Sequence, residues 1–290
     1  MTQLSQTQKS NQWLHDFASN VYSQNGEDGI IAKVLEVINE RSGWCVEFGA
    51  WDGIHLSNTC NLIKNYGSAA VLIEGNPQRC QEIKQNFDSS QKVIPINAFV
   101  GFEPENCLDS ILKQTEIPTN FDLLSIDIDG NDYHIWDSVQ HYRPKVVVIE
   151  YNPTIPNPVD FVQPQDMNVS QGSSLLSINK LAKQKGYELV AVTYCNGIFV
   201  DAQYFPLFEI EDNSVIALRT EEPVVTYIFN GYDGTVFVRG CEGLVWHYVA
   251  YRESSLQQIP KWLRSDPQYD NKFKGWLRNI YYRLRFNQII

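Results

Sequence analysis

Two short runs of this chain are apolar almost from end to end, AAVLIE at residues 69–74 and VVVIE at residues 146–150. A strand with one face in water alternates apolar and polar residues, whereas a strand that helices cover on both faces does not. The chain therefore predicts a buried, mostly parallel sheet. The strand candidates are residues 45–48, 70–74, 92–100, 121–127 and 145–151.

Helical patterns lie between and after these strands, at residues 56–66, 77–87, 106–114, 132–139 and 174–185. Such alternation of strands and helices is typical of a doubly wound α/β fold. Two later strands, 189–194 and 198–200, form an antiparallel pair that we expect to turn around Asn196-Gly197, a dipeptide favoured in hairpins. The prediction is a mostly parallel, seven-stranded sheet in a domain of residues 1–205.

Residues 206–290 do not continue this alternation of strands and helices, and they predict a C-terminal extension. Strand-like runs at 224–229 and 235–239 indicate a β-hairpin, and residues 261–290 form a basic tail with seven Lys or Arg against Asp266 and Asp270. The tail is positive although the chain has a formal net charge of −11. It favours docking on a membrane or an acidic protein partner, or a helix packed on the body or at a dimer contact.

The acidic balance, 23 Lys and Arg against 34 Asp and Glu, argues against a nucleic-acid partner because phosphates repel an acidic surface. The six cysteines lie far apart, and no Cys-x-x-Cys pair indicates a zinc or redox site. The chain has neither a signal-peptide pattern nor an apolar run of about 18 residues, the length that spans a bilayer. We expect a soluble, cytoplasmic protein with free thiols.

The turn after the first strand, in WCVEFGAWDG at residues 44–53, predicts a ligand site. Gly49 and Gly53 lack a Cβ, so backbone amides of this turn can approach a ligand closely; a plain structural turn is the alternative. Glu74 ends the second strand, where its carboxylate can accept hydrogen bonds from both ribose hydroxyls of an adenosyl group. A solvated carboxylate at the strand end is the alternative. Phe99, at the end of the third strand, would then lie near the adenine.

The fourth strand runs into FDLLSIDIDGNDYHIW at residues 121–136, which gathers Asp127, Asp129, Asn131, Asp132 and His134. Open α/β folds bind ligands at this carboxyl edge of the sheet. Carboxylates so close together repel one another unless a cofactor sulfonium, a divalent metal or a shared proton joins them. Asn131 and Asp132 can instead cap the following helix.

The fifth strand ends with Glu150 and Asn152, next to the tip of the fourth strand. We expect Asp127, Asp129 and Glu150 to activate a hydroxyl, either as general bases or by holding a divalent cation. His134 is a spare base or a residue of the helix surface. The candidate metal ligands are Asp129, Glu150 and Asn152.

A long segment without periodicity, residues 151–172, follows the fifth strand and carries four prolines. Loops of this length inside compact domains are often functional. We expect residues 153–171 to form a lid that covers the acceptor and excludes water.

These motifs together resemble the FkbM-type methyltransferases, class I enzymes that use S-adenosylmethionine (SAM) and mainly methylate hydroxyls on sugars and natural products. The resemblance covers roughly residues 20–205 and rests on YSQNGEDGII, VEFGAWDG, LIEGNPQR, LLSIDIDGNDYHIW, IEYNP and SLLSINKLAKQKGYELV. It implies a Rossmann-like fold, SAM as the cofactor, O-methylation, and a small-molecule or glycan acceptor. In that family the segment at residues 22–31 lies over the cofactor pocket; the alternative is that residues 23–28 are a polar turn that caps a helix at 30–38. The candidate cofactor residues are therefore Gln24, Glu27, Glu47, Gly49, Gly53, Glu74 and Phe99.

A weaker similarity reaches the macrolide-sugar O-methyltransferases, whose Leu-Asp-Gly-Asp-x-Tyr segment binds a metal. This chain has Ile-Asp-Gly-Asn-Asp-Tyr at residues 128–133, and Glu-Tyr-Asn at 150–152 where that group has Asp-Asp-Tyr. The similarity makes Mg²⁺ or another divalent cation a candidate cofactor, and the departures leave the metal-free alternative open.

Two other functions compete with methyl transfer. An NAD-dependent oxidoreductase would also place an acidic residue such as Glu74 on a ribose. Against it, the first turn lacks the second glycine that lets a pyrophosphate approach, and no Tyr-x-x-x-Lys pair is placed to assist hydride transfer. A non-catalytic binding protein on the same fold would use the basic tail as its working surface. An oligomer is compatible with all three functions.

Overall fold

The structure, a computed structural model, describes residues 10–40 and 43–285 of the chain. The chain divides into two compact units between Glu221 and Glu222. The first unit holds the large sheet and the helices that cover it, and the second holds short strands and a C-terminal helix.

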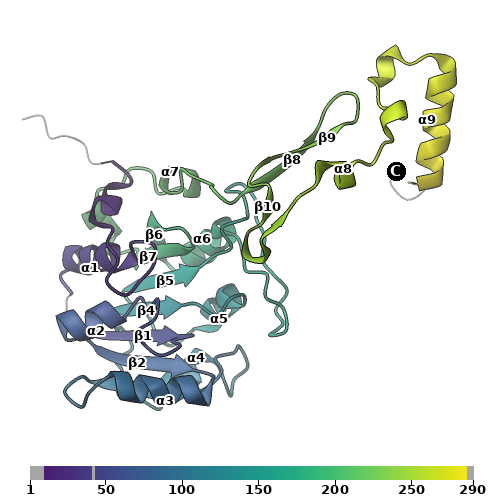
Figure 1. Cartoon of the computed structure of the whole chain (residues 1–290). Coiled ribbons are helices and arrows are strands. Elements are labelled where there is room, and N and C mark those ends of the chain that lie inside the picture. The colour runs from purple at the N-terminus through teal and green to yellow at the C-terminus, as the bar shows by residue number, and fades with distance from the viewer. Residues whose placement is uncertain (1–9, 41–42, 286–290) are drawn as a thin grey trace, which may run out of the picture. The chain divides into compact units, whose positions relative to one another are not determined.

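The sheet of the first unit has the strand order β3-β2-β1-β4-β5-β7-β6 (Figure 1). β7 is antiparallel to its neighbours β5 and β6, and the other strand pairs of this sheet are parallel, so the predicted seven-stranded, mostly parallel sheet is confirmed. The order reverses between β1 and β4, and ligands bind at such a point in open α/β sheets. The strands are β1 (Trp44–Phe48), β2 (Ala69–Glu74), β3 (Val93–Asn97), β4 (Leu123–Ile126), β5 (Val146–Glu150), β6 (Tyr187–Val192) and β7 (Asn196–Asp201).

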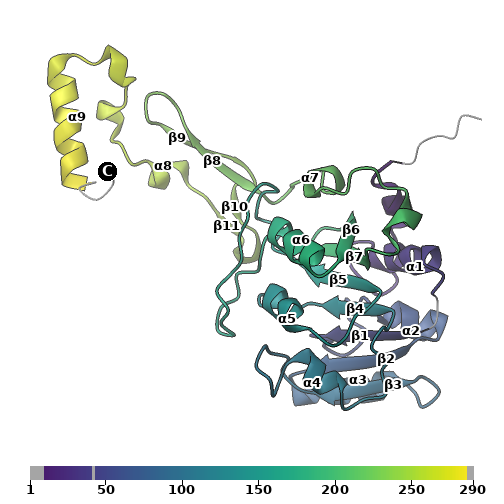
Figure 2. The same cartoon turned by 180° about the vertical axis from the view of Figure 1, so that it is seen from behind.

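Helices cover both faces of this sheet (Figures 1 and 2). Successive side chains of a strand point to opposite faces, so Val71 and Ile73 of β2 pack in one core while Leu72 packs in the other. Burying each such side chain contributes about 1.5–3 kcal/mol, which is why the strands are apolar throughout. One face carries α1 (Glu27–Val37), α2 (Cys60–Tyr66) and α3 (Pro77–Asn86), and the other carries α4 (Leu108–Leu112), α5 (Asp132–Ser138) and α6 (Leu175–Gln184).

The hairpin at the end of the sheet turns earlier than the sequence predicts. β6 ends at Val192 and β7 begins at Asn196, so residues 193–195 form the turn and the prediction of a turn at Asn196-Gly197 was wrong. The Asn196 side chain is buried and donates to Glu27, which keeps this residue inside the fold. A Cβ on Gly197 would lie 2.8 Å from the Phe199 ring, so this glycine serves packing.

The first unit extends beyond residue 205, where the sequence places the domain boundary. It includes η2 (Phe205–Phe208), a 3₁₀ turn, and α7 (Val215–Leu218). Phe208 is fully buried, and its carbonyl accepts a hydrogen bond from Trp13 Nε1 at 2.9 Å. Short elements of this kind have too little periodicity to be recognised from sequence.

The second unit contains a β-hairpin at residues 226–240 and a basic C-terminal helix at residues 272–285. Glu253 of α8 (Glu253–Leu256) accepts hydrogen bonds from Val238 N and the Arg239 guanidinium, which join α8 to β9. In the part of the chain that the structure describes, no helix is long and apolar enough to cross a bilayer. The other elements of this unit are β8 (Thr226–Asn230), β9 (Val236–Gly240), β10 (Gly243–Leu244), β11 (Val249–Ala250) and α9 (Lys272–Arg285).

Candidate functional site

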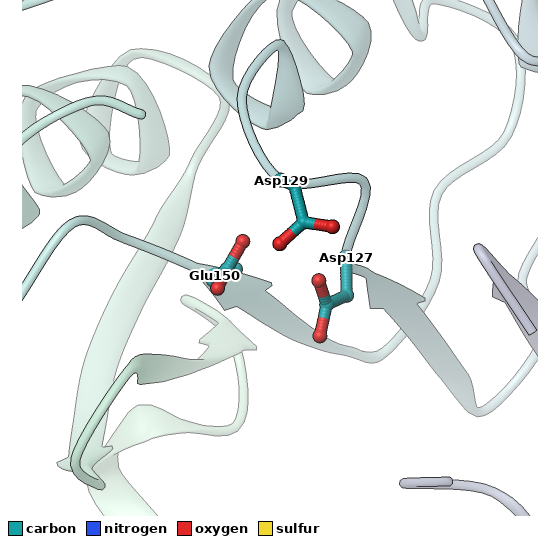
Figure 3. A group of neighbouring side chains, drawn as sticks. All are labelled: Asp127, Asp129 and Glu150. Carbon is teal, nitrogen blue, oxygen red and sulfur yellow. The ribbon is translucent and has the colours of Figure 1, made fainter. Parts of the chain in front are cut away.

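Three carboxyl groups face one another at the carboxyl edge of the sheet (Figure 3). Asp127 follows β4, Glu150 ends β5, and Asp129 lies in the turn between β4 and α5. One oxygen of each carboxyl group lies within 4.8 Å of the others; Asp127 and Glu150 are partly buried and Asp129 is exposed. The structure thus brings together the three residues that the sequence places at neighbouring strand ends.

Asp132 fixes the turn that presents Asp129. Its two carboxylate oxygens accept hydrogen bonds from Ile128 N and Gly130 N, each at 2.9 Å. Asp129 has φ 58°, a left-handed conformation that Asp tolerates better than most residues. Asp132 therefore closes the turn, close to the capping role considered for it from sequence.

The acidic cluster shares protons at neutral pH. Burial, together with repulsion from Asp132 and Asp129, raises the pKa of Asp127 to about 7. Burial, together with repulsion from Asp127, raises the pKa of Glu150 to about 10. Glu150 is then protonated at pH 7 and hydrogen-bonds Asp127. Among residues 10–40 and 43–285, no Lys, Arg or His forms an ion pair with Asp127, Asp129 or Glu150, so the cluster favours a cationic ligand.

Glu74 joins the turn after β1 to the turn after β2. One carboxylate oxygen accepts from Trp51 N at 2.9 Å, and the other accepts from Asn76 N at 2.7 Å. The residue is partly exposed, and each oxygen retains a lone pair for a further donor. Glu74 can therefore hold the loop and a ligand hydroxyl at the same time.

Two exposed aromatic rings lie near Glu74. Phe99 is 73% exposed and its ring covers Gly75, where a Cβ would come within 2.3 Å of the ring. Trp51 is 47% exposed, and the Arg79 guanidinium lies 4.0 Å from its ring centroid. These rings offer flat apolar surface next to a carboxylate, the combination that a nucleoside requires.

Gly49 and Gly53 are needed for packing within the protein. Both have positive φ, 71° and 78°. A Cβ on Gly49 would lie 1.9 Å from the Asp127 carbonyl oxygen, and a Cβ on Gly53 would lie 2.7 Å from the Phe87 ring. Because Gly49 has no Cβ, the turn after β1 can contact the backbone of Asp127, the first residue of the acidic cluster.

The structure places Glu47 inside the protein. Its carboxylate accepts from Ser57 Oγ and Thr59 Oγ1, each at 2.6 Å, and from Asn58 N at 2.9 Å. Burial raises the pKa of Glu47, and these hydrogen bonds oppose the rise. Glu47 therefore holds the loop that precedes α2.

Gln24 and Glu27, the candidates of the N-terminal motif, lie in different environments. Gln24 is exposed, and its carbonyl accepts from the Asn20 side chain. Glu27 is fully buried and accepts from Thr193 Oγ1 at 2.6 Å and from Asn196 Nδ2 at 3.2 Å. Glu27 thus ties the start of α1 to the β6–β7 turn.

His134 and Asn131 contact the long loop after β5. His134 Nε2 lies 2.8 Å from the Gln163 carbonyl oxygen, and Asn131 Nδ2 donates to the Asp166 carbonyl at 3.0 Å. The Asn152 amide is also engaged with this loop, since Oδ1 accepts from Thr154 N and Nδ2 donates to the Gln171 carbonyl. These contacts fasten the loop to the edge of the sheet.

Sequence reasoning missed two residues that organise this loop. Gln163 is 1% exposed and accepts from Gln171 N and Gly172 N, which closes the loop on itself. Arg219 is 6% exposed and donates to carbonyls at the start of the loop. No local pattern marks Gln163, and the only signal for Arg219 is a charge that directly follows an apolar run.

A third missed residue, Cys195, lies in the β6–β7 turn close to the acidic cluster. Burial raises the pKa of its thiol, and the charges of Glu150 and Glu27 raise it further. The Cys195 carbonyl accepts from Tyr151 N, which joins this turn to the end of β5. The Cys195 thiol is therefore neutral at pH 7 and presents apolar surface next to the cluster.

Comparison with protein families finds one match at this site. Residues 53–189 match the family model of the methyltransferase FkbM domain. The matched segment contains Glu74, Phe99, Asp127, Asp129 and Glu150. The motifs that include Glu27 and Glu47 lie before it. A search of curated proteins gives no match.

Several solved structures are similar to this chain. TrmK of M. capricolum in complex with S-adenosylhomocysteine is 14% identical, with 58% of this chain and 67% of that chain covered and a TM-score of 0.37. The N-terminal domain of EvdMO1 with S-adenosylhomocysteine bound is 10% identical, with 62% and 82% covered and a TM-score of 0.39. Precorrin-6y C5,15-methyltransferase from Geobacter metallireducens is 16% identical, with 63% and 92% covered and a TM-score of 0.38.

Proposed function

We propose that this protein, whose residues 53–189 match the family model of the methyltransferase FkbM domain, transfers a methyl group to a hydroxyl of a sugar or small natural product. The observation that carries the proposal is the convergence of Asp127, Asp129 and Glu150 at the tips of β4 and β5. SAM, the proposed cofactor, supplies an activated methyl group on a positively charged sulfonium. The three carboxyl groups lack an ion-pair partner among the described residues, which suits a cationic ligand.

The edge of the sheet offers groups that fit the remaining parts of SAM. Glu74 keeps a lone pair on each carboxylate oxygen for the ribose hydroxyls. Phe99 and Trp51 present exposed rings for the adenine. Glu47 and Glu27 are buried in hydrogen bonds within the protein, so we propose that they support the pocket walls rather than touch the cofactor.

The acceptor hydroxyl must lose a proton, because the pKa of an alcohol lies far above neutral. Asp127 is suited to be the general base, since burial and its acidic neighbours raise its pKa to about 7. Alternatively, a divalent cation bound by the oxygens of Asp127, Asp129 and Glu150 would acidify the hydroxyl. The Asn152 amide is committed to the loop, so this set of three is the better candidate for a cation.

We propose that the loop of residues 153–171 forms the wall that covers the acceptor. His134 holds this wall through the Gln163 carbonyl, which makes it a positioning residue rather than a base. A covered site excludes water and keeps the charges of the cluster effective. The six cysteines are free thiols, in keeping with the cytoplasm, which we propose as the compartment.

Turnover assays with an Asp129 variant test the proposal. The full chain is incubated with SAM and a panel of sugars and hydroxylated metabolites, and S-adenosylhomocysteine formation is measured. Asp129→Asn should lower turnover by about a hundredfold or more and leave SAM binding within about threefold. Glu116→Gln is the control, because Glu116 is an exposed carboxylate paired with Lys92 and lies outside the site and the loop. Full activity of Asp129→Asn would remove this residue from the mechanism.

A chelator distinguishes the two ways of activating the hydroxyl. If a divalent cation acts, EDTA abolishes turnover and added Mg²⁺ restores it. If Asp127 is the base, EDTA has no effect, and Asp127→Asn abolishes turnover at every pH tested. In that second case the rate should rise as the pH passes the Asp127 pKa of about 7.

A further inference from the structure

The C-terminal helix α9 carries an exposed apolar face. Phe273 is 66% exposed, Trp276 57% and Leu284 81%. Leu277 and Ile280 complete the stripe, since residues three, four and seven positions apart lie on one side of a helix. A helix of a globular protein normally buries such a stripe.

One side of α9 packs inside its own unit. Arg278 is 5% exposed, pairs with Asp270 at 2.8 Å and donates to the Leu263 and Ser265 carbonyls. The Tyr281 hydroxyl donates to the Gln258 carbonyl. The orientation of α9 is therefore fixed by its polar side, and this orientation leaves the apolar stripe outward.

Positive charge borders the stripe on both sides. Lys272 and Arg283, eleven residues or three turns apart, lie along one border. Lys274 and Arg285 lie at the same spacing along the other border, on the packed side of the helix, where they donate to the carbonyls of Arg264 and Gln258. The helix has no acidic residue. Residues 222–290 hold nine Lys or Arg against six Asp or Glu, although the whole chain has a net charge of −11. The basic charge is thus concentrated where the apolar face is exposed.

We propose that α9 docks on the surface of a membrane that contains anionic lipids. Apolar and Trp side chains on one face with Lys and Arg at its borders are typical of helices that lie in the plane of a bilayer interface. Phe273, Trp276 and Leu284 enter the boundary between headgroups and acyl chains, and Lys272 and Arg283 contact lipid phosphates. A flat lipid surface suits one straight, narrow apolar stripe. The negative charge of the lipid headgroups complements the Lys and Arg residues that border the stripe. This inference does not depend on the proposed methyl transfer.

Vesicle sedimentation of the full chain tests the proposal. One vesicle preparation contains phosphatidylcholine alone, and the other contains phosphatidylcholine with about one third phosphatidylserine. We expect binding to the anionic vesicles at least about tenfold tighter than to the neutral ones, and weaker binding as salt rises because salt screens the phosphate contacts. No binding to the anionic vesicles would overturn the proposal.

Substitutions within the stripe locate the binding surface. Trp276→Asp combined with Leu284→Asp should weaken binding to the anionic vesicles by about tenfold or more, since each places a charge in the apolar boundary. Lys272→Glu combined with Arg283→Glu should remove the preference for anionic vesicles. Ile216→Asp in the first unit is the matched control, because Ile216 is 67% exposed and lies outside α9.

Two outcomes would assign the apolar face to another occupant. If the chain is a dimer that Trp276→Asp dissociates, and neither form binds vesicles, the face is a contact between two copies. If vesicles bind equally to the chain and to all α9 variants, another surface is responsible. Thermal unfolding and S-adenosylhomocysteine binding of each variant show whether the fold is intact, and both should match the unsubstituted chain.

Discussion

At the tip of β5, the Glu150 carboxyl group is surrounded by acidic neighbours and by little water. Burial raises the pKa of Glu150 to about 10 and that of Asp127 to about 7, whereas an unfolded chain has values of about 4. The folded protein therefore binds more protons than the unfolded chain between these values. Because of this difference, the contribution of the pair to stability falls as the pH rises above about 4.

The Glu150→Gln variant tests this proton sharing. In the presence of a chelator, we expect the melting temperature of the unsubstituted chain to fall between about pH 6 and about pH 9. In Glu150→Gln the melting temperature should fall less over this pH range, because an amide keeps the shape of the side chain and does not ionise. Glu116→Gln, at an exposed carboxylate paired with Lys92, is the control that keeps the original slope. An unchanged slope in Glu150→Gln would show that the cluster does not hold the extra proton.

Glu47, within β1, and Glu74, at the end of β2, are predicted to have different roles. Glu47→Ala should lower the free energy of unfolding by about 3 kcal/mol, because it leaves buried donors of residues 57–59 unpaired. Glu74→Ala should cost less than about 1 kcal/mol, because its amide partners are near water, but should weaken S-adenosylhomocysteine binding about tenfold or more. Denaturant unfolding and calorimetry measure the two effects. Equal loss of stability in both variants would contradict this division.

At the residue scale, the sequence predicts which acidic groups meet but not what each one binds. Asp127 and Glu150 lie on adjacent parallel strand ends, and strand order follows from the fold. The inward direction of Glu47 depends on the hydroxyls of Ser57 and Thr59, which pack only once the loop is formed. The Asn152 amide is likewise taken by the loop after β5, which no local pattern indicates.

The start of the loop of residues 151–172 is held by one buried cation, Arg219. Arg219 donates to the carbonyls of Pro153 and Ile155 and to the Asn157 side chain. Arg219→Met should lower the free energy of unfolding by about 2–4 kcal/mol and make this loop the first site of proteolytic cleavage. Lys113→Met, at an exposed position outside this loop, is the control. A loop that resists protease in Arg219→Met would show that other contacts hold it.

Element boundaries differ from the sequence prediction where side chains compete with regular structure. The second helix was predicted from residue 56, but α2 begins at Cys60, because Leu56 has φ 55° and residues 57–59 bind Glu47. The third strand was predicted to residue 100, but β3 ends at Asn97, whose side chain donates to the carbonyls of Glu74 and Gly75. The apolar runs predict the strands, and these tertiary hydrogen bonds decide where elements stop.

At the scale of the whole molecule, the two units carry different chemistry. All candidate residues for the cofactor and the acceptor lie in the first unit, which ends at Glu221. A chain that ends at Glu221 should therefore bind S-adenosylhomocysteine within about threefold of the full chain and unfold in one cooperative transition. Its vesicle binding should be lost. Calorimetry and thermal unfolding check these outcomes, and loss of cofactor binding would show that the second unit completes the site.

The proposed use of SAM is tested most directly by calorimetric titration of the full chain with S-adenosylhomocysteine, with NAD as the control ligand. We predict a dissociation constant of about 1 μM or lower for S-adenosylhomocysteine, a loss of affinity of about tenfold or more in Glu74→Ala, and no heat with NAD. Tightening of the binding by Mg²⁺ would add support for a cation at Asp127, Asp129 and Glu150. Binding of NAD, or no binding of S-adenosylhomocysteine, would contradict the proposed methyl transfer.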